Sequence, residues 1–130
     1  ASSGLIKVGA ASVLSEDPML GADIGLLALG RPLGVVAEAS FENKFDAFDV
    51  LIDFTSPEAT LQHLALCCQA GKAMVIGTTG FAPENLAAID DAAKKIPIVM
   101  APNFSVGVNL CLQLLRKAAT CLAFSSSRKI

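Results

Sequence analysis

The run Ala73-Met74-Val75-Ile76-Gly77-Thr78-Thr79-Gly80 decides the fold that the sequence predicts. Its first four residues are apolar and indicate a strand buried on both faces, and this strand stops at small and hydroxyl residues. Apolar runs at 49–53 and 96–100 also end in small or polar residues. We therefore predict three strands whose ends line one edge of a sheet, where open parallel sheets bind ligands.

Two segments of helical period separate these strands. In the first, Ser56 and Pro57 fit the cap and the first residue of a helix, apolar residues recur from Leu61 to Cys68, and Gly71 marks the end. The second has Leu86, Ile89 and Ala93 at the same spacing, with Lys94 and Lys95 in its expected last turn. Strands that alternate with helices form parallel sheets because the crossovers are almost always right-handed. The predicted fold class is therefore α/β, a Rossmann-like three-layer fold with a mostly parallel sheet.

The rest of the chain carries weaker patterns. Residues 5–14 indicate a strand, 19–34 an irregular connection of low helical content, and 33–37 a short edge strand. Ser40 can cap a helical turn from which Phe41 and Phe45 pack inward. Residues 109–122 predict a long helix whose wide apolar stripe packs on the sheet. We expect one partial dinucleotide-binding domain at 1–122 and an irregular tail at 123–130.

Composition and charge exclude several classes of protein. The 130 residues are 53% apolar and 17% charged, as in a globular domain, and the net charge is -2. We expect no nucleic-acid partner and no membrane partner, since basic residues do not cluster and no apolar run approaches the roughly 20 residues of a membrane span. We expect a cytoplasmic protein, without a metal site, whose four cysteines are buried thiols: Cys67, Cys68, Cys111 and Cys121.

The loop at 77–80 is the strongest candidate for ligand binding. A glycine at a strand end lets a backbone or a flat ring approach closely, and the hydroxyls of Thr78 and Thr79 can bond amide or ribose oxygens. An ordinary strand-to-helix loop has the same composition. Phe54 can pack against a ligand ring or belong to the core. His63, the only histidine, is expected to be structural or solvent-facing, since its mid-helix position carries it away from the sheet edge.

Three motifs in register resemble those of a known family. Asp-Val-Leu-Ile-Asp-Phe-Thr-Ser-Pro-Glu at 49–58, Gly-Thr-Thr-Gly-Phe at 77–81 and Ala-Pro-Asn-Phe-Ser-Val-Gly-Val-Asn at 101–109 are similar to dihydrodipicolinate reductase (4-hydroxy-tetrahydrodipicolinate reductase) of lysine (diaminopimelate) biosynthesis. The likeness covers about residues 5–118. It implies a domain that binds NADPH or NADH and a hydride transfer to a cyclic unsaturated dicarboxylate. The residues it places at the nicotinamide half are Gly77, Thr78, Thr79, Ala101, Pro102, Asn103 and Phe104, flanked by Phe54 and Thr55.

The sequence departs from the family in ways that shape the expectation. The glycine-rich fingerprint of dinucleotide-binding domains and the strand before it are absent, and Val13 and Leu14 stand where the family often has an acidic residue and an arginine. The substrate domain with its His-His-x-x-Lys motif is also absent, so no catalytic residue is predicted. We expect a fragment that is inactive alone, of marginal stability and prone to self-association. The family suggests a homo-tetramer and a small-molecule substrate held by the missing domain.

Two other functions remain open from the sequence. One is a fragment of a glucose-fructose oxidoreductase-type dehydrogenase, but those enzymes usually have Glu-Lys-Pro where Gly77-Thr78-Thr79 stands. The other is a non-catalytic nucleotide-binding module that uses Thr78, Thr79 and Asn103 as polar contacts. Micromolar binding of NADPH or NADH by the chain favours a working module, and undetectable binding favours a remnant.

Overall fold

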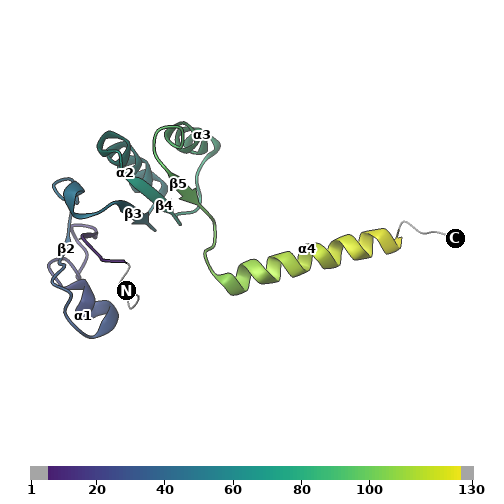
Figure 1. The fold of residues 1–130 in the computed structure, drawn as a ribbon, viewed down its shortest axis with the longest axis horizontal. Coiled ribbons are helices and arrows are strands. Elements are labelled where there is room, and N and C mark those ends of the chain that lie inside the picture. Colours follow the sequence, from purple (N-terminus) through teal and green to yellow (C-terminus); the bar gives the residue numbers. More distant parts are fainter. Residues whose placement is uncertain (1–5, 127–130) are drawn as a thin grey trace.

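Parallel strands and flanking helices form the described part of the chain, which in the computed structural model is residues 6–126. Strands β3, β4 and β5 form one parallel sheet in that order, and β1 and β2 form a separate parallel pair (Figure 1). The predicted α/β Rossmann-like class is confirmed. The elements are β1 (Ala11–Ser12), α1 (Ile24–Leu29), β2 (Ala37–Glu38), the 3-10 helix η1 (Phe45–Ala47), β3 (Val50–Asp53), α2 (Pro57–Ala70), β4 (Ala73–Ile76), α3 (Pro83–Ala92), β5 (Ile98–Met100) and α4 (Val106–Ser126).

Helix α2 begins and ends where local chemistry requires. The Ser56 hydroxyl accepts a hydrogen bond from the Ala59 N–H at 3.3 Å, and Pro57 occupies the first turn. Gly71 ends the helix with a φ of 65°, a left-handed conformation in which glycine is at least cost. The buried face of α2 differs from the predicted face by one residue. Thr60, Leu64 and Cys67 are buried, whereas Leu61 and Cys68, which were predicted to face the core, are half-buried.

Helix α3 is shorter than the sequence predicted. It ends at Ala92, so Lys94 and Lys95 lie beyond its last turn rather than within it. The chain turns there, with the Lys95 N–H donating to the Ala92 carbonyl at 2.8 Å. Lys94 pairs instead with Asp91 at 2.6 Å.

The core lies between the larger sheet and the two helices α2 and α3, which cover the same face. Both crossovers step in the same direction along the sheet, so their shared right hand places both helices on one side (Figure 1). On the opposite face Val50, Ile52 and Val99 are 48%, 65% and 57% exposed. The described residues therefore form two layers, a sheet and one layer of helices, and not the three layers that were predicted. The buried cluster is Leu64, Cys67, Met74, Ile76, Ile89, Ala92 and Ile96.

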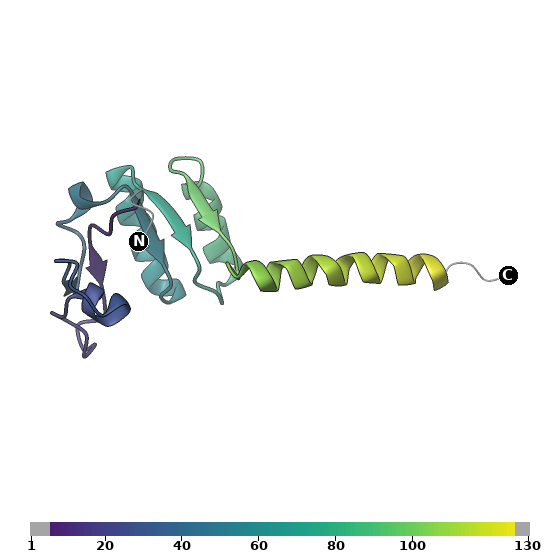
Figure 2. The same cartoon turned by 60° about the horizontal axis from the view of Figure 1, so that its bottom comes forward.

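Helix α4 extends away from the sheet, which contradicts the prediction that it packs there (Figures 1 and 2). All of its residues up to Leu122 are exposed. Its departure is set by the preceding loop: the Ser105 hydroxyl accepts from the Val108 N–H, and the Asn109 amide donates to the carbonyls of Asn103 and Ser105. The helix continues to Ser126 rather than ending at Leu122. The remainder of the predicted tail, 127–130, lies outside the described residues.

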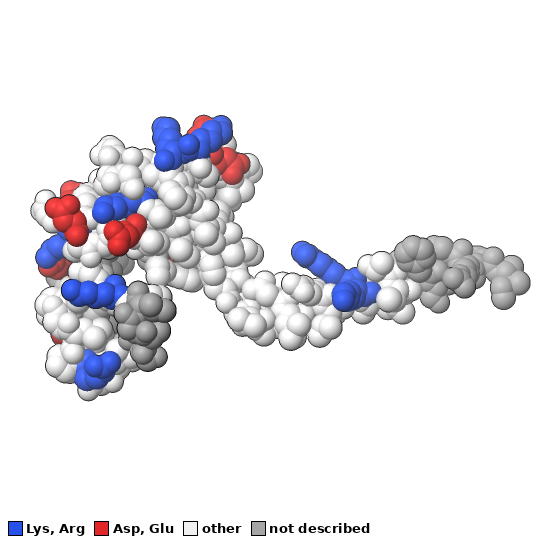
Figure 3. All heavy atoms as spheres, in the orientation of Figure 1, with Lys and Arg blue, Asp and Glu red and all other residues white. Residues whose placement is uncertain are grey.

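The surface of α4 is apolar along most of its length. Arg116 and Lys117 are its only charged residues, and the side chains around them are uncharged (Figure 3). Cys111 and Cys121 on this helix are exposed and Cys68 is half-buried, so the expectation that all four cysteines are buried holds for Cys67 alone. In the part of the chain with described placement, no helix combines the length and apolarity that a membrane crossing needs.

The segment before β3 differs most from the prediction. Of the strand expected at 5–14, only β1 forms within the described part, and β2 lies at the end of the edge strand expected at 33–37. Helix α1 occupies part of the predicted irregular connection, because Asp23 caps it through the N–H groups of Gly25 and Leu26. The expected turn at 40–45 forms instead as η1, although Phe41 does pack inward and is 4% exposed.

Candidate functional site

The ends of β3, β4 and β5 form one continuous rim. Asp53 pairs with Ile76, and Ile76 with Met100, so the three strands reach the edge together. The hydrogen bonds between the strands continue one residue beyond the strand ends. The Gly77 N–H donates to the Asp53 carbonyl at 2.8 Å, and the Ala101 N–H donates to the Ile76 carbonyl at 3.2 Å. The predicted convergence of the loops at 54–55, 77–79 and 101–104 is therefore confirmed.

Two aromatic rings give the rim an apolar surface. The centroids of Phe54 and Phe104 lie 5.9 Å apart with their planes at 62°, and the side chains are 64% and 43% exposed. Phe54 therefore does not belong to the core. Its ring lies against the backbone of Gly77, where any Cβ atom would collide with it. Glycine at this strand end thus allows the ring to approach, in the way the sequence predicted.

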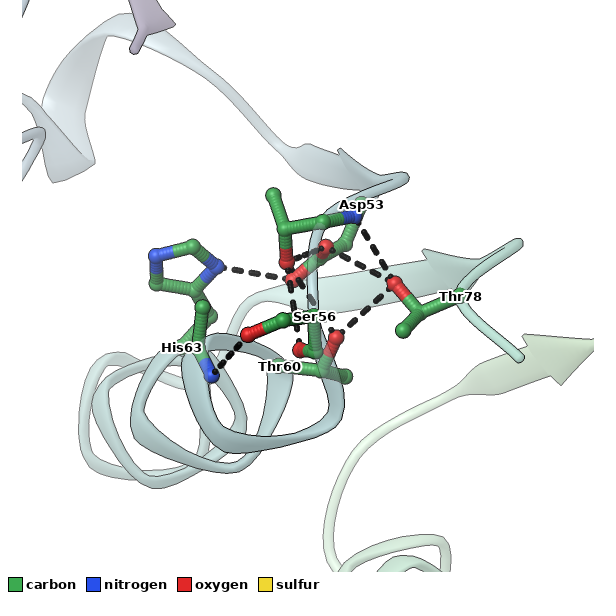
Figure 4. Close-up of polar contacts among 7 residues, drawn as sticks. Asp53, Ser56, Thr60, His63 and Thr78 are labelled. Atoms are coloured by element: carbon green, nitrogen blue, oxygen red, sulfur yellow. Dashed lines mark hydrogen bonds and ion pairs between the residues drawn. The ribbon is translucent and has the colours of Figure 1, made fainter. Parts of the chain in front are cut away.

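A buried polar network lies directly beneath the rim (Figure 4). The Asp53 carboxylate, 2% exposed, accepts a hydrogen bond from the Thr55 hydroxyl at 2.6 Å and pairs with His63 Nδ1 at 2.7 Å. The Thr78 hydroxyl donates to Asp53 Oδ1 at 3.3 Å. It also accepts from the Thr55 N–H and from the Thr60 hydroxyl, each at 2.9 Å. These bonds join β3, α2 and the loop after β4.

The network keeps the Asp53 carboxylate ionised. Burial by itself raises the pKa of Asp53, but hydrogen bonds from His63, Thr55 and Thr78, with the charge of His63, outweigh that effect and leave the pKa below its ordinary value. Burial also raises the pKa of the nearby Cys67 thiol to about 11, with smaller contributions from Cys68 and Asp53. Cys67 is therefore a neutral thiol at physiological pH and no nucleophile.

His63 lies closer to the rim than the sequence indicated. Its position in the middle of α2 was expected to carry it away from the sheet edge, yet its ring reaches the last residue of β3. The reason is that Thr60, His63 and Cys67 follow one another at spacings of three and four and share the helix face that meets the sheet. This spacing was visible in the sequence and is the signal that could have found His63.

The two threonines after β4 point to different environments. Thr78 is 5% exposed, and its hydroxyl accepts two hydrogen bonds and donates one, which is all that a hydroxyl can make. Thr79 is exposed on the rim. Asn103 is also exposed, and its Oδ1 accepts the Ser105 N–H at 2.7 Å. Of the two hydroxyls expected to contact a ligand, that of Thr79 is the one on the surface.

The remaining candidate residues complete the third loop of the rim. Ala101 is half-buried and Pro102 is exposed. The rim thus combines aromatic surface, one exposed hydroxyl and one exposed amide, a set that suits a flat, polar ring. Among the residues that the structure describes, no three His, Cys, Asp or Glu side chains gather as a metal site would require.

Comparisons with known proteins agree with the motifs. The family model described as "Dihydrodipicolinate reductase, N-terminus" matches residues 2–104. A relative named 4-hydroxy-tetrahydrodipicolinate reductase, from Syntrophotalea carbinolica, is 50% identical over 108 residues, which are 83% of this chain and 40% of that protein. A solved amine dehydrogenase from Mycobacterium smegmatis has a TM-score of 0.52 at 23% identity, covering 72% of this chain and 31% of the other. This second likeness shows the fold alone.

The family match takes in most of the chain and the whole rim, from Asp53 to Phe104. The chain spans about 40% of the length of the named reductase. The resemblance seen in the sequence is confirmed: this chain belongs to the family of dihydrodipicolinate reductase N-terminal domains.

Proposed function

We propose that this chain is the nucleotide-binding part of an NAD(P)H-dependent 4-hydroxy-tetrahydrodipicolinate reductase of lysine biosynthesis. The observation that carries the proposal is the rim, where three strand ends bring together Phe54, Gly77 and Phe104. Membership of the reductase N-terminal family and the 50% identical relative support it. They also favour it over a glucose-fructose oxidoreductase-type enzyme.

The rim suits the nicotinamide end of a dinucleotide. Phe54 and Phe104 offer exposed aromatic surface, against which a flat ring can stack. The Thr79 hydroxyl and the exposed amide of Asn103 can hydrogen-bond to the carboxamide or the ribose. Thr55, Thr78, Ala101 and Pro102 contribute the backbone of the loops that hold these groups. When bound, the reduced nicotinamide supplies the hydride.

The polar network contributes support rather than chemistry. Thr78 is saturated by protein hydrogen bonds, so its role is to hold the loop and not to contact the ligand through its hydroxyl. No residue of this chain is proposed as a catalytic acid or base. The chain alone is expected to be inactive, with the cyclic unsaturated dicarboxylate bound by another part of the whole enzyme. Assembly as a homo-tetramer is a further prediction for that enzyme, measurable by sedimentation.

Titration with each cofactor tests the proposal. The chain has no Trp or Tyr, so the fluorescence of NADPH or NADH can be followed on binding without interference from protein emission. Micromolar binding supports the proposal, and the tighter of the two ligands gives the preference. Undetectable binding of both contradicts cofactor binding by this chain and favours a remnant.

A matched pair of variants locates the site. Thr79→Val removes the exposed rim hydroxyl and should weaken binding about three- to tenfold, the usual contribution of one neutral hydrogen bond. Thr120→Val is the control, because Thr120 lies on α4 and its hydroxyl donates only to the Arg116 carbonyl. Equal affinities for the two variants would place the ligand away from Thr79.

A further inference from the structure

One buried charged group has no direct place in the proposed binding surface. The Asp53 carboxylate is 2% exposed, so it faces the protein and not a ligand on the rim. A buried carboxylate is costly unless it is paired and hydrogen-bonded. Both oxygens of the Asp53 carboxylate have side-chain partners: Oδ2 pairs with His63, and Oδ1 accepts from the hydroxyls of Thr55 and Thr78.

The two oxygens of this carboxylate connect α2 to the rim. Oδ2 is 2.7 Å from His63 Nδ1, on the helix, while Oδ1 holds the hydroxyls of Thr55 and Thr78, in the loops after β3 and β4. The Thr78 hydroxyl in turn accepts the Thr55 N–H at 2.9 Å. The two loops are therefore fastened to each other and to one carboxylate, whose orientation is fixed from the helix side (Figure 4).

The His63 ring is itself held from a third direction. The centroid of Phe41 lies 5.0 Å from that of His63, at an edge-on angle of 62°, and Phe41 is 4% exposed. Phe41 also packs edge-on against Phe45 and Phe48, each at 5.9 Å. This aromatic cluster limits the rotation of the imidazole, so Nδ1 stays directed at Asp53.

We propose that His63 is a positioning residue for the rim: through Asp53 it fixes the loops that carry Phe54, Thr55 and Thr79. The claim that these loops bind a cofactor rests on the proposed function, whereas the claim that His63 orders the loops does not. The hydrogen bond that links His63 to the rim loops is the one to Asp53, so His63 acts through this carboxylate. Loss of its N–H should release Asp53 Oδ2, loosen both loops and lower the fraction of molecules able to bind.

Amide hydrogen exchange tests the ordering of the loops without any ligand. The Thr55 N–H, bonded to Thr78, reports the loops, and the Met74 N–H, bonded to the Pro97 carbonyl, reports the sheet. In His63→Leu the Thr55 amide should exchange about tenfold faster relative to the Met74 amide. In His63→Asn, whose amide nitrogen falls near the Nδ1 position, the ratio should stay close to that of the unmodified chain.

Two results of the exchange experiment would overturn the inference. One is a Thr55 amide that exchanges at the same rate in all chains. The other is equal acceleration at Thr55 and Met74, since it would mean that His63 supports the fold as a whole. If His63→Leu does not fold, His63→Gln replaces it, because its amide nitrogen falls near the Nε2 position instead.

The binding measurement adds a second readout. If nine-tenths of the molecules lose the ordered rim, the apparent Kd for NADPH or NADH rises tenfold, and His63→Asn should recover most of that loss. Equal affinity of His63→Leu and the unmodified chain would refute the positioning role. If the unmodified chain binds neither cofactor, the proposed function fails, while the exchange ratio still decides whether His63 orders the loops.

Discussion

Replacing Thr78 by valine should separate the buried threonine from its exposed neighbour. Valine has nearly the same shape as threonine, so the change removes the hydroxyl while leaving the packing in place. The Thr55 N–H and the Thr60 hydroxyl then lose their acceptor, and Asp53 loses one donor. Thr60 is fully buried, and its one other contact within the network, with the Thr55 hydroxyl, is long at 3.4 Å.

The magnitude follows from the groups left without partners. The buried Thr60 hydroxyl costs about 1–3 kcal/mol once it loses its acceptor, and it can recover part of this by turning to Thr55. Thr55 is an exposed residue, so the loss of the acceptor of its N–H adds less. Asp53 keeps His63 and the Thr55 hydroxyl, so it adds little. We expect Thr78→Val to lower the free energy of unfolding by about 1–3 kcal/mol, which is a large share of the stability of a small domain.

Urea unfolding followed by far-ultraviolet circular dichroism measures this effect, with the m-value as a check that the compactness of the two states is unchanged. Thr79→Val is the matched control. Thr79 is exposed, so its replacement should change the free energy of unfolding by no more than about 0.5 kcal/mol. Equal losses for the two variants would refute the assignment of Thr78 to the buried network. A Thr78→Val chain already unfolded without urea is the extreme form of the expected result.

Three further predictions concern charge, reactivity and backbone conformation. The pKa of Asp53 is lowered in the folded chain, so the ionised carboxylate stabilises the fold. The unmodified chain should therefore be more stable than Asp53→Asn above the ordinary pKa of 3.8, and this difference should shrink as the pH falls through the lowered pKa. A difference in stability that stays constant in acid would argue against this role of Asp53. Near neutral pH, iodoacetamide should label Cys111 quickly and the buried Cys67 only on unfolding, as peptide mapping would show; rapid labelling of Cys67 would contradict its burial and its raised pKa. Gly71→Ala should destabilise the chain by about 1 kcal/mol in urea because of the left-handed φ, while Gly107→Ala in α4 should be neutral or stabilising; similar costs would count against this reasoning.

The elements that the sequence predicted well are those with a local cause. Ser56 and Gly71 bound α2 through hydrogen bonds and a backbone conformation that depend on residues within one turn. The apolar runs around β4 needed no partner to be recognised as strands, and their parallel direction followed from the helices that separate them. The rim was therefore predictable, since strands of similar length in a parallel sheet end side by side.

The features that the sequence missed depend on contacts between distant segments. The helix at the C-terminal end was expected to pack on the sheet because its stripe is apolar, but an apolar stripe does not specify the surface that covers it. Likewise, composition could not say which of two adjacent threonines would face inward.

The sequence by itself determined the three strands of the larger sheet, the two crossover helices and the rim at which their loops meet, because hydrophobic period and helix caps are local properties. Only the tertiary structure decided that Thr78 is buried while Thr79 is exposed, and that His63 meets Asp53 beneath the rim. The physical reason is that a buried carboxylate needs hydrogen-bond donors, and these donors come from residues that are far apart in the sequence. Those partners come from a helix face and two loops that the chain brings together only on folding.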